Sequence, residues 1–421
     1  MALEREVEGQ GLALEKNTSG SSLRMLPLCL AVSVVGLGQS MLFVMLPILT
    51  EETGIGLGGF SLVMTGGILA FFLAAPFWGR LGDRRDRRQV MLSGCAFVLL
   101  GHGGFVFVVE ASVAGLIGPD AGLLALLFAR IVYGAAAAAL FPVAQAWVGD
   151  VAAEAARLRG LAGLSAAMSA GRLLGPPLAA GLTILAPLMP LYALLASALL
   201  SALALLFLRP APPRAGPPEE VPAGKDSGRI SAVIAAGLLL TTMLGQLQFT
   251  LGVQVQARLG LEATASSQFV GVLLTAATLA AFVIQVTLVR RSRSLPSLLL
   301  AVVCGLAAAG VGAIAWGEGR IHFLVGAVAV GAAVAVAFPL CAALVTALAG
   351  PQRRGRFLGF FASAQTLGYA CGALLGGLYA WAPTASYALA AAAPLLAFGL
   401  IQIGLRGRRF AQQGRAQEGG A

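Results

Sequence analysis

The sequence predicts an all-α membrane protein whose twelve transmembrane helices form two pseudo-symmetric six-helix halves. Three observations predict this fold class: the composition, a series of twelve apolar segments, and an internal repeat. Of the 421 residues, 58% are hydrophobic and 11% are charged, whereas soluble domains carry about 25% charged residues. Because a water-soluble core of this size cannot bury so much apolar surface, we expect a polytopic membrane protein.

The apolar segments have the length that a membrane helix requires. A helix needs about 20 residues to cross about 30 Å of hydrocarbon, and such segments occupy residues 25–48, 60–79, 89–109, 121–147, 158–184, 188–208, 231–257, 267–289, 296–316, 321–348, 356–382 and 385–405. A polar stretch rich in proline and glycine separates six segments from the other six, and we expect it to be a linker. The predicted units are therefore a tail of residues 1–24, an N-terminal half of 25–208, a linker of 209–230, a C-terminal half of 231–405 and a tail of 406–421.

Basic residues are distributed unevenly between the two sides of the predicted membrane. Of the 28 lysines and arginines, 24 fall in the termini and in alternate loops on one side, and only Arg258 and Arg320 fall on the other. This bias predicts that both termini are cytoplasmic. It also accounts for the net charge of +10, so we expect the lipid bilayer, and no nucleic acid, as a partner. The abundance of Ala, Gly and Arg suggests a bacterial source, and we expect a monomer in the inner membrane.

An internal repeat relates the two halves. A shift of 197 residues superposes several landmarks of segments four and five on segments ten and eleven: Gly134 on Gly331, Phe141-Pro142 on Phe338-Pro339, Arg159 on Arg356, Gly171 on Gly368, and Gly175 on Gly372. The matched segments are six apart, so the two halves have the same orientation. In transporters built from such parallel repeats, the substrate site lies between the halves near the bilayer midplane.

Three motifs stand out along the chain. Between segments two and three, seven of the ten residues 79–88 are charged (Gly79-Arg80-Leu81-Gly82-Asp83-Arg84-Arg85-Asp86-Arg87-Arg88). Segment four contains Leu126-x-x-x-Arg130-x-x-x-Gly134, and segment five contains Gly171-x-x-x-Gly175-Pro176. Small residues four positions apart allow close helix packing in any membrane bundle, so the third motif is compatible with a purely structural role.

Together these motifs resemble those of the major facilitator superfamily (MFS) of secondary transporters, and the resemblance covers about residues 25–405. The third motif resembles that of exporters that work by antiport with protons. The chain departs from the usual patterns at Asp86, where a second Gly is expected, and at Ala179-Ala180, where Gly-Gly is expected. The resemblance implies the MFS fold and alternating access.

The resemblance also implies which residues change partners during transport. In the family, the Asp that corresponds to Asp83 contacts the start of segment eleven, here residues 355–357, and holds an outward-facing state. Arg354 or Arg356 is positioned to pair with it. The expected conformational residues are Asp83, Gly79, Arg84, Arg87, Arg88, Arg356, Gly171, Gly175 and Pro176.

Two arginines, Arg130 and Arg172, lie inside predicted membrane segments, whereas none of the 18 acidic residues lies deep in one. A charged side chain at mid-membrane costs at least about 2.5–3.5 kcal/mol, so it should face a polar interior. The repeat places Tyr369 opposite Arg172 across a central cavity. We therefore expect an anionic, carboxylate-bearing substrate, such as a siderophore, that supplies the missing negative charge.

Polar residues of other segments are further candidates for the cavity. Segment seven carries Thr242, Gln246, Thr250 and Gln254 on one helical face, which indicates either a cavity lining or hydrogen bonds between helices. The complete set of expected substrate-binding residues is Arg130, Arg172, Tyr369, Gln246, Thr250, Gln365 and Gln39.

The sequence favours a proton-coupled exporter of a small organic molecule, with a multidrug or tetracycline-type efflux pump and an organic-acid uptake system as alternatives. An anion exchanger also stays open, because proton coupling follows from the resemblance alone. There is no Gly-x-x-x-x-Gly-Lys-Ser/Thr phosphate-binding motif, so ATP is not the expected energy source. No metal-ligand cluster or nucleophile motif occurs either, so we expect neither an enzyme nor a cofactor.

Overall fold

The computed structural model describes residues 2–151, 154–208, 227–289, 297–350 and 353–418. The first half comprises α1 (Ala2–Thr53), α2 (Leu57–Arg84), α3 (Arg87–Val113), α4 (Pro119–Ala137), α5 (Leu140–Val151), α6 (Glu154–Leu182) and α7 (Met189–Leu206). The second half comprises α8 (Ser227–Leu259), α9 (Ala263–Ile284), the π-helical turn η1 (Gln285–Val289), α10 (Ser297–Trp316), α11 (Arg320–Ala349), α12 (Arg354–Gly377), the 3-10 turn η2 (Leu378–Ala380) and α13 (Pro383–Glu418). Throughout these ranges the regular secondary structure is helical, as predicted.

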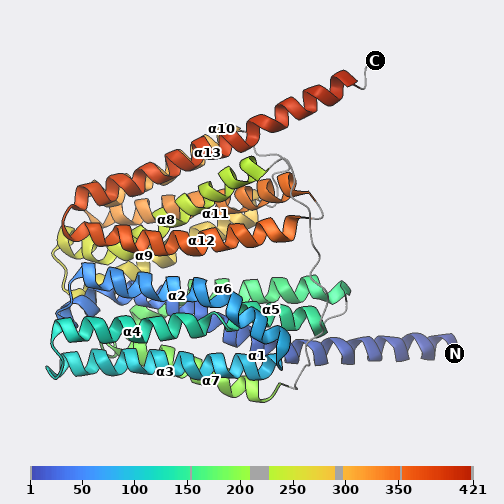
Figure 1. Cartoon of the computed structure of the whole chain (residues 1–421), viewed down its shortest axis with the longest axis horizontal. Helices are drawn as coiled ribbons and strands as arrows, with labels where there is room; N and C mark the ends of the chain where they lie inside the picture. Colours follow the sequence, from blue (N-terminus) through green and yellow to red (C-terminus); the bar gives the residue numbers. More distant parts are fainter. Residues whose placement is uncertain (1, 152–153, 209–226, 290–296, 351–352, 419–421) are drawn as a thin grey trace.

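The two halves lie one above the other, with their helices side by side and both termini at the same end of the bundle (Figure 1). We call this the terminal end. Within the described residues, eleven spans are long and apolar enough to cross a membrane, with α4 and α5 together forming one of them. The twelfth is α6, which is more polar because it carries Arg157, Arg159 and Arg172 among small residues. The predicted all-α membrane fold is confirmed, and eleven of the twelve predicted segments meet the length and apolarity of a membrane span.

One predicted segment is not a continuous helix. Residues 121–147 were expected to form a single span, but α4 ends at Ala137 and α5 begins at Leu140. The backbone N–H of Ala139 donates to the carbonyl of Ala136, a tighter turn than that of an α-helix. Pro142 lies in the first turn of α5, where it lacks the N–H that would continue the α-helical hydrogen bonds of the preceding turn. The break therefore has a local chemical cause.

Other boundaries also differ from those predicted. Helix α1 extends back to Ala2 and α13 extends to Glu418, so the helices continue into residues that the sequence assigned to tails. Helix α9 ends at Ile284 and gives way to the π-helical turn before the predicted end at residue 289. Most of the predicted linker, residues 209–226, lies outside the described residues.

Helix packing repeats between the halves. In the first half α1 packs on α6 and α7, and α4 packs on α2 and α3. In the second half α8 packs on α12 and α13, and α11 packs on α9 and α10. The halves meet where α2 contacts α12 and where α6 contacts α9, two contacts that the pseudo-symmetry exchanges.

Glycines at the repeated positions explain why the same pairs of helices approach closely. A Cβ at Gly134 would collide with the carbonyl oxygen of Gly67 in α2, and a Cβ at Gly331 would collide with that of Ala277 in α9. Gly171 likewise lies against the backbone of α1 at Ser33. Packing of backbone against backbone requires residues without a side chain, so the repeat preserves the crossing points of the helices.

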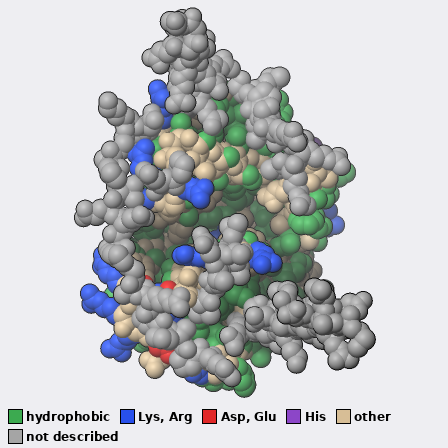
Figure 2. All heavy atoms as spheres, turned by 90° about the vertical axis from the view of Figure 1, so that its right-hand side faces the viewer, with side chains coloured by type: hydrophobic (Ala, Val, Ile, Leu, Met, Phe, Trp, Pro, Cys, Tyr) green, Lys and Arg blue, Asp and Glu red, His purple; other side chains and the backbone are tan. Residues whose placement is uncertain are grey.

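At the end opposite the termini, the halves are in close contact. A Cβ at Gly271 of α9 would lie 2.9 Å from the carbonyl oxygen of Pro176 in α6. A Cβ at Gly377 of α12 would lie 2.5 Å from the hydroxyl oxygen of Ser61 in α2. At the terminal end, in contrast, the surface is hollowed between the halves (Figure 2). The molecule is therefore closed at one end and open at the other.

Candidate functional site

A cavity of about 530 Å³ lies between the halves. Residues of α1 and α6 line it from the first half, and residues of α8 to α12 line it from the second. Its volume falls in the range of pockets for small-molecule ligands. Because it lies between two pseudo-symmetric halves, it occupies the position that the internal repeat predicts for a substrate site.

Arg172 is the one charged residue among the described residues that line this cavity. It comes from the middle of α6, and its guanidinium carbon lies 6.0 Å from the centroid of the Tyr369 ring on α12. The repeat offset of 197 predicted that these two side chains face each other, and this geometric expectation is confirmed. Arg172 has no salt bridge in the described part of the chain, so its charge faces the open cavity without a counter-ion.

The proline motif of α6 lies directly beside Arg172. Pro176 has no N–H to donate to the carbonyl of residue 172, four positions earlier, so that carbonyl lacks its usual helical partner. Such a break in hydrogen bonding is tolerated in a membrane helix where it lines a cavity. Gly175, one residue before the proline, packs against the Ser40 hydroxyl of α1. The motif thus fixes α6 against α1 while Pro176 lines the cavity.

Several neutral polar side chains also line the cavity. Gln39 of α1 and Gln285 of η1, both polar residues of predicted membrane segments, were candidates for it, whereas Gln248 of α8 was not. Within the described residues, none of the three amides has a hydrogen-bond partner. They are therefore free to bind a polar ligand. Gln248 was missed because it lies outside the stripe of residues four apart.

Arg130 does not line the described cavity, contrary to the expectation that both arginines share it. Its side chain is 7% exposed, and its guanidinium carbon lies 4.4 Å from the centroid of the Tyr133 ring. Gly67 of α2 packs against the Arg130 side chain, because a Cβ at Gly67 would lie 2.7 Å from Arg130 Cγ. His102 of α3 lies beside Tyr133, with ring centroids 6.0 Å apart. Arg130 is thus packed within the first half.

The polar face of α8 that carries Gln246, Thr250 and Gln254 does not line the cavity either. Gln246 Nε2 donates to the carbonyl of Ser386 on α13 at 2.6 Å, and the Thr250 hydroxyl donates to Tyr387 Oη at 3.3 Å. Gln254 Nε2 donates to the carbonyl of Ala315 on α10 at 2.9 Å. Gln246 and Thr250 were expected to line the substrate site, but the structure shows that they form hydrogen bonds between helices, which was the other possibility for this face. Gln365 precedes Tyr369 by one turn of α12 and is not among the residues that line the cavity.

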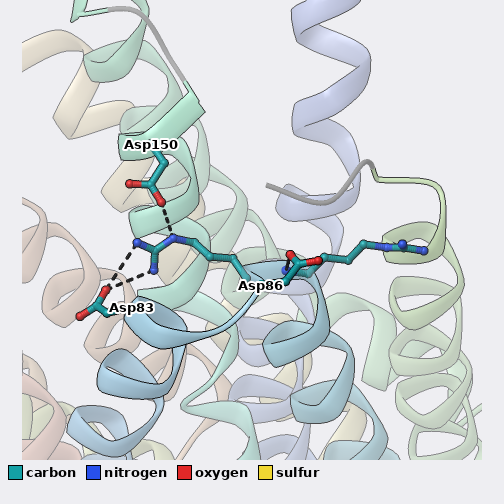
Figure 3. A network of polar contacts seen from close by, with 5 residues as sticks. Asp83, Asp86 and Asp150 are labelled. Atoms are coloured by element: carbon teal, nitrogen blue, oxygen red, sulfur yellow. Dashed lines mark hydrogen bonds and ion pairs between the residues drawn. The ribbon is translucent and has the colours of Figure 1, made fainter. Parts of the chain in front are cut away.

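The charged loop is organised around Arg87, whose side chain is 4% exposed. Its Nε donates to Asp150 Oδ2 of α5 at 2.5 Å, and its Nη1 lies 3.4 Å from Asp83 Oδ1 (Figure 3). Asp86, the departure from the family pattern, caps α3 by accepting from the backbone N–H of Arg88 at 2.9 Å. The buried cation of Arg87 thus connects the loop to α5 of the first half.

Asp83 does not contact the start of α12 in this structure. Its carboxylate is 69% exposed and is paired with Arg87, while Arg356 lies over the Phe360 ring at 5.6 Å. The terminal end is open here, so the expected contact of Asp83 with residues 355–357 is absent from this state and stays a prediction for a state in which that end is closed.

The remaining residues of the loop have distinct roles. Arg88 donates from Nε to the carbonyl of Leu205 at 3.1 Å, at the end of α7, whereas Arg84 is exposed. A Cβ added at Gly79 would meet open space, whereas a Cβ added at Gly82 would lie 3.3 Å from Arg87 Nη1 and from Val143 Cγ2. Gly82 is therefore the glycine of this loop that permits close packing, and the expected conformational role of Gly79 stays a prediction. Asp150 was missed because nothing in its local sequence identifies its distant partner.

Comparison with known proteins agrees with this geometry. Residues 28–321 match the model of the Major Facilitator Superfamily. Two curated relatives are triacylglyceride transporters, from Mycolicibacterium smegmatis (32% identity over 114 residues) and Mycolicibacterium hassiacum (33% over 117). The matched region spans 27% of this chain in both cases, but only 18% and 19% of those proteins.

Solved structures of transporters share the fold over nearly the whole chain. A D-xylose–proton symporter has a TM-score of 0.68 at 14% identity, covering 90% of this chain and 96% of that one. The human organic anion transporter MFSD10 has a TM-score of 0.60 at 20% identity, covering 90% and 99%. At such identities the likeness concerns the fold alone. The family match covers well over half of the chain, and we conclude that this protein belongs to the Major Facilitator Superfamily, a family of membrane transporters and not of enzymes.

Proposed function

We propose that this protein is a secondary transporter that exports a small organic anion, in particular a carboxylate, by alternating access. The observation that carries the proposal is the charge of the cavity: Arg172 lines it, and no acidic residue among the described lining residues balances that charge. A guanidinium pairs with a carboxylate through two parallel hydrogen bonds. An anionic substrate would therefore supply the counter-charge that the protein lacks at this position.

The same charge links substrate binding to the conformational change. When the halves close the terminal end, Arg172 loses water, and an unpaired buried cation is costly. A bound anion offsets this cost, so the loaded protein closes more readily than the empty one. With both termini cytoplasmic, as the distribution of basic residues predicts, the open state described here would face the cytoplasm and load substrate for export.

Coupling to protons is supported by the resemblance of the α6 motif to that of proton antiporters. A second candidate is anion exchange, which the unpaired Arg172 favours, because a second anion would neutralise the guanidinium during the return step. The two are separated in proteoliposomes. Proton antiport requires a pH gradient across the vesicle membrane. Anion exchange requires a second anion on the opposite side of the membrane and persists without a pH gradient.

The multidrug alternative predicts a different cavity. Pumps for cationic drugs use buried acidic residues to attract their substrates, whereas the described cavity presents a cation. The triacylglyceride transporters named above suggest a neutral lipid as another substrate. Resistance of an efflux-deficient host to hydrophobic cations would support the drug pump in place of the organic-anion transporter.

The test is export profiling of a deletion strain against its complement, with Arg172→Ala and Arg172→Lys alongside. We expect Arg172→Ala to abolish export of an anionic metabolite, and Arg172→Lys to retain part of it, because lysine keeps the charge but loses the two-pronged geometry. Arg320→Ala is the matched control, since Arg320 lies over Phe269 and does not line the cavity. Unchanged export by both Arg172 variants would refute the proposal.

A further inference from the structure

The wall that α11 contributes to the cavity is apolar. The lining residues of α11 are Ala327, Val330, Gly331, Val334 and Phe338, and α10 adds Ile314. The α11 residues are spaced by three or four positions and therefore lie on one helical face. From residue 327 to residue 338 the face extends for about 17 Å, at 1.5 Å per residue. A hydrophilic substrate would leave this surface without a partner.

The polar lining comes from helices other than α11. We call Gln39 of α1, Ser169 and Arg172 of α6 and Tyr369 of α12 the polar side, and Gln248 of α8 and Gln285 of η1 add two further amides to the lining. Ser169 precedes Arg172 by three residues, so the two lie on the same face of α6. Thr278 of α9 also lines the cavity, but its hydroxyl donates to the carbonyl of Leu274 at 2.6 Å, which leaves its methyl group for contact with a ligand.

We propose that the substrate is an amphiphilic anion, with an acidic headgroup bound at Arg172 and a hydrocarbon chain lying along the apolar face of α11. This inference rests on the proposed function and specifies its substrate class. A ligand that consists of a headgroup alone would contact the polar side and leave the α11 face in contact with water. An alkyl chain removes that face from water, and each buried methylene contributes about 0.8 kcal/mol. The hydrocarbon chain should therefore provide much of the binding free energy.

Two cysteine variants in a cysteine-free background report on the two ends of the ligand. Ser169→Cys marks the headgroup side, and Val334→Cys marks the α11 face. The measured quantity is the rate of labelling by a small thiol reagent in nanodiscs. The probes are decanesulfonate, methanesulfonate and decanol, because the first two share a headgroup and the first and third share a chain. Sulfonates keep their charge at all relevant pH values.

We expect decanesulfonate to slow labelling at both positions, at concentrations at least about tenfold below those of methanesulfonate, whose effect should be confined to Ser169→Cys. Decanol should require at least about tenfold higher concentration than decanesulfonate, because it cannot form charge-assisted hydrogen bonds with the guanidinium. Adding Arg172→Ala should reduce protection by decanesulfonate to the level of decanol. A cysteine at Val325, which is exposed on α11 and does not line the cavity, should show no headgroup-dependent protection.

The outcomes distinguish the two proposals. If both sulfonates protect Ser169→Cys at equal concentrations and Val334→Cys is never protected, the substrate is an anion without a hydrocarbon chain, and the amphiphile inference is wrong while the organic-anion function stands. If decanol and decanesulfonate protect equally and Arg172→Ala has no effect, the anionic substrate itself is refuted, and a neutral lipid takes its place.

Discussion

Arg87 shows how a single charged side chain can hold a loop on a membrane protein. Its guanidinium is buried between Asp150 of α5 and Asp83 of α2. Burying a charge is costly unless it is compensated, and the loss of one member of a buried ion pair leaves the other without compensation. The two acidic partners lie on different helices, so this residue connects the α2–α3 loop to the end of the fourth span.

We predict that Arg87→Ala destabilises the protein by roughly 3–5 kcal/mol, because it leaves the largely buried carboxylate of Asp150 unpaired. The measurement is thermal unfolding of the purified protein in detergent. Arg84→Ala is the control, since Arg84 lies in the same loop but is exposed. Equal unfolding temperatures for the two variants would contradict the role of Arg87.

At the scale of elements, the crossings of helices are set by glycines whose side-chain positions are occupied by backbone. Gly134 lies against Gly67 where α4 crosses α2, and Gly331 lies against Ala277 where α11 crosses α9. In lipid, packing of this kind replaces the hydrophobic driving force that acts in water. The two crossings are therefore equivalent in the two halves.

We expect Gly134→Val and Gly331→Val to be equally damaging, because in each case the new side chain would overlap a carbonyl group. Overpacking of this kind costs about 1–3 kcal/mol or more. The control is Gly359→Val on α12, where the Cβ position is open. Yield and monodispersity after detergent extraction give the readout. A folded Gly134→Val protein with normal thermal stability would refute the prediction.

At the scale of the whole molecule, the structure has the geometry of one of the two states of the proposed alternating access. The halves are in contact at the end opposite the termini, through Gly271 with α6 and Gly377 with α2, and are separated at the terminal end. Asp83 is exposed at that open end. Closing the terminal end would bring Asp83 towards α12, where a carboxylate is favoured at the helix N-terminus.

We predict that Asp83→Asn shifts the population towards the state with an open terminal end, because the closed state loses the contact of this carboxylate with α12. Labelling of Ser169→Cys by a membrane-impermeant reagent in inside-out vesicles should then become faster. Asp86→Asn is the control, since Asp86 caps α3 within its own half. Slower or unchanged labelling in Asp83→Asn would show that Asp83 does not stabilise the closed state.

The sequence by itself determined the number of spans, the division into halves and the pairing of Arg172 with Tyr369. A bilayer allows few solutions for an apolar chain, since backbone groups must be satisfied within helices, and duplication carries each position to its counterpart. Helical spacing also identified the polar face of α8. These features depend on local chemistry and on repetition, and both can be read along the chain.

The tertiary structure alone decided which neighbour each face meets. It places Arg130 against Tyr133 and Arg172 in the cavity, although both were equally charged and central in their segments. It directs the polar face of α8 towards α10 and α13. Periodicity shows which residues share a face, but the rotation of a helix about its axis is set by packing against all of its neighbours at once. That information is spread over the whole bundle and is absent from any single segment.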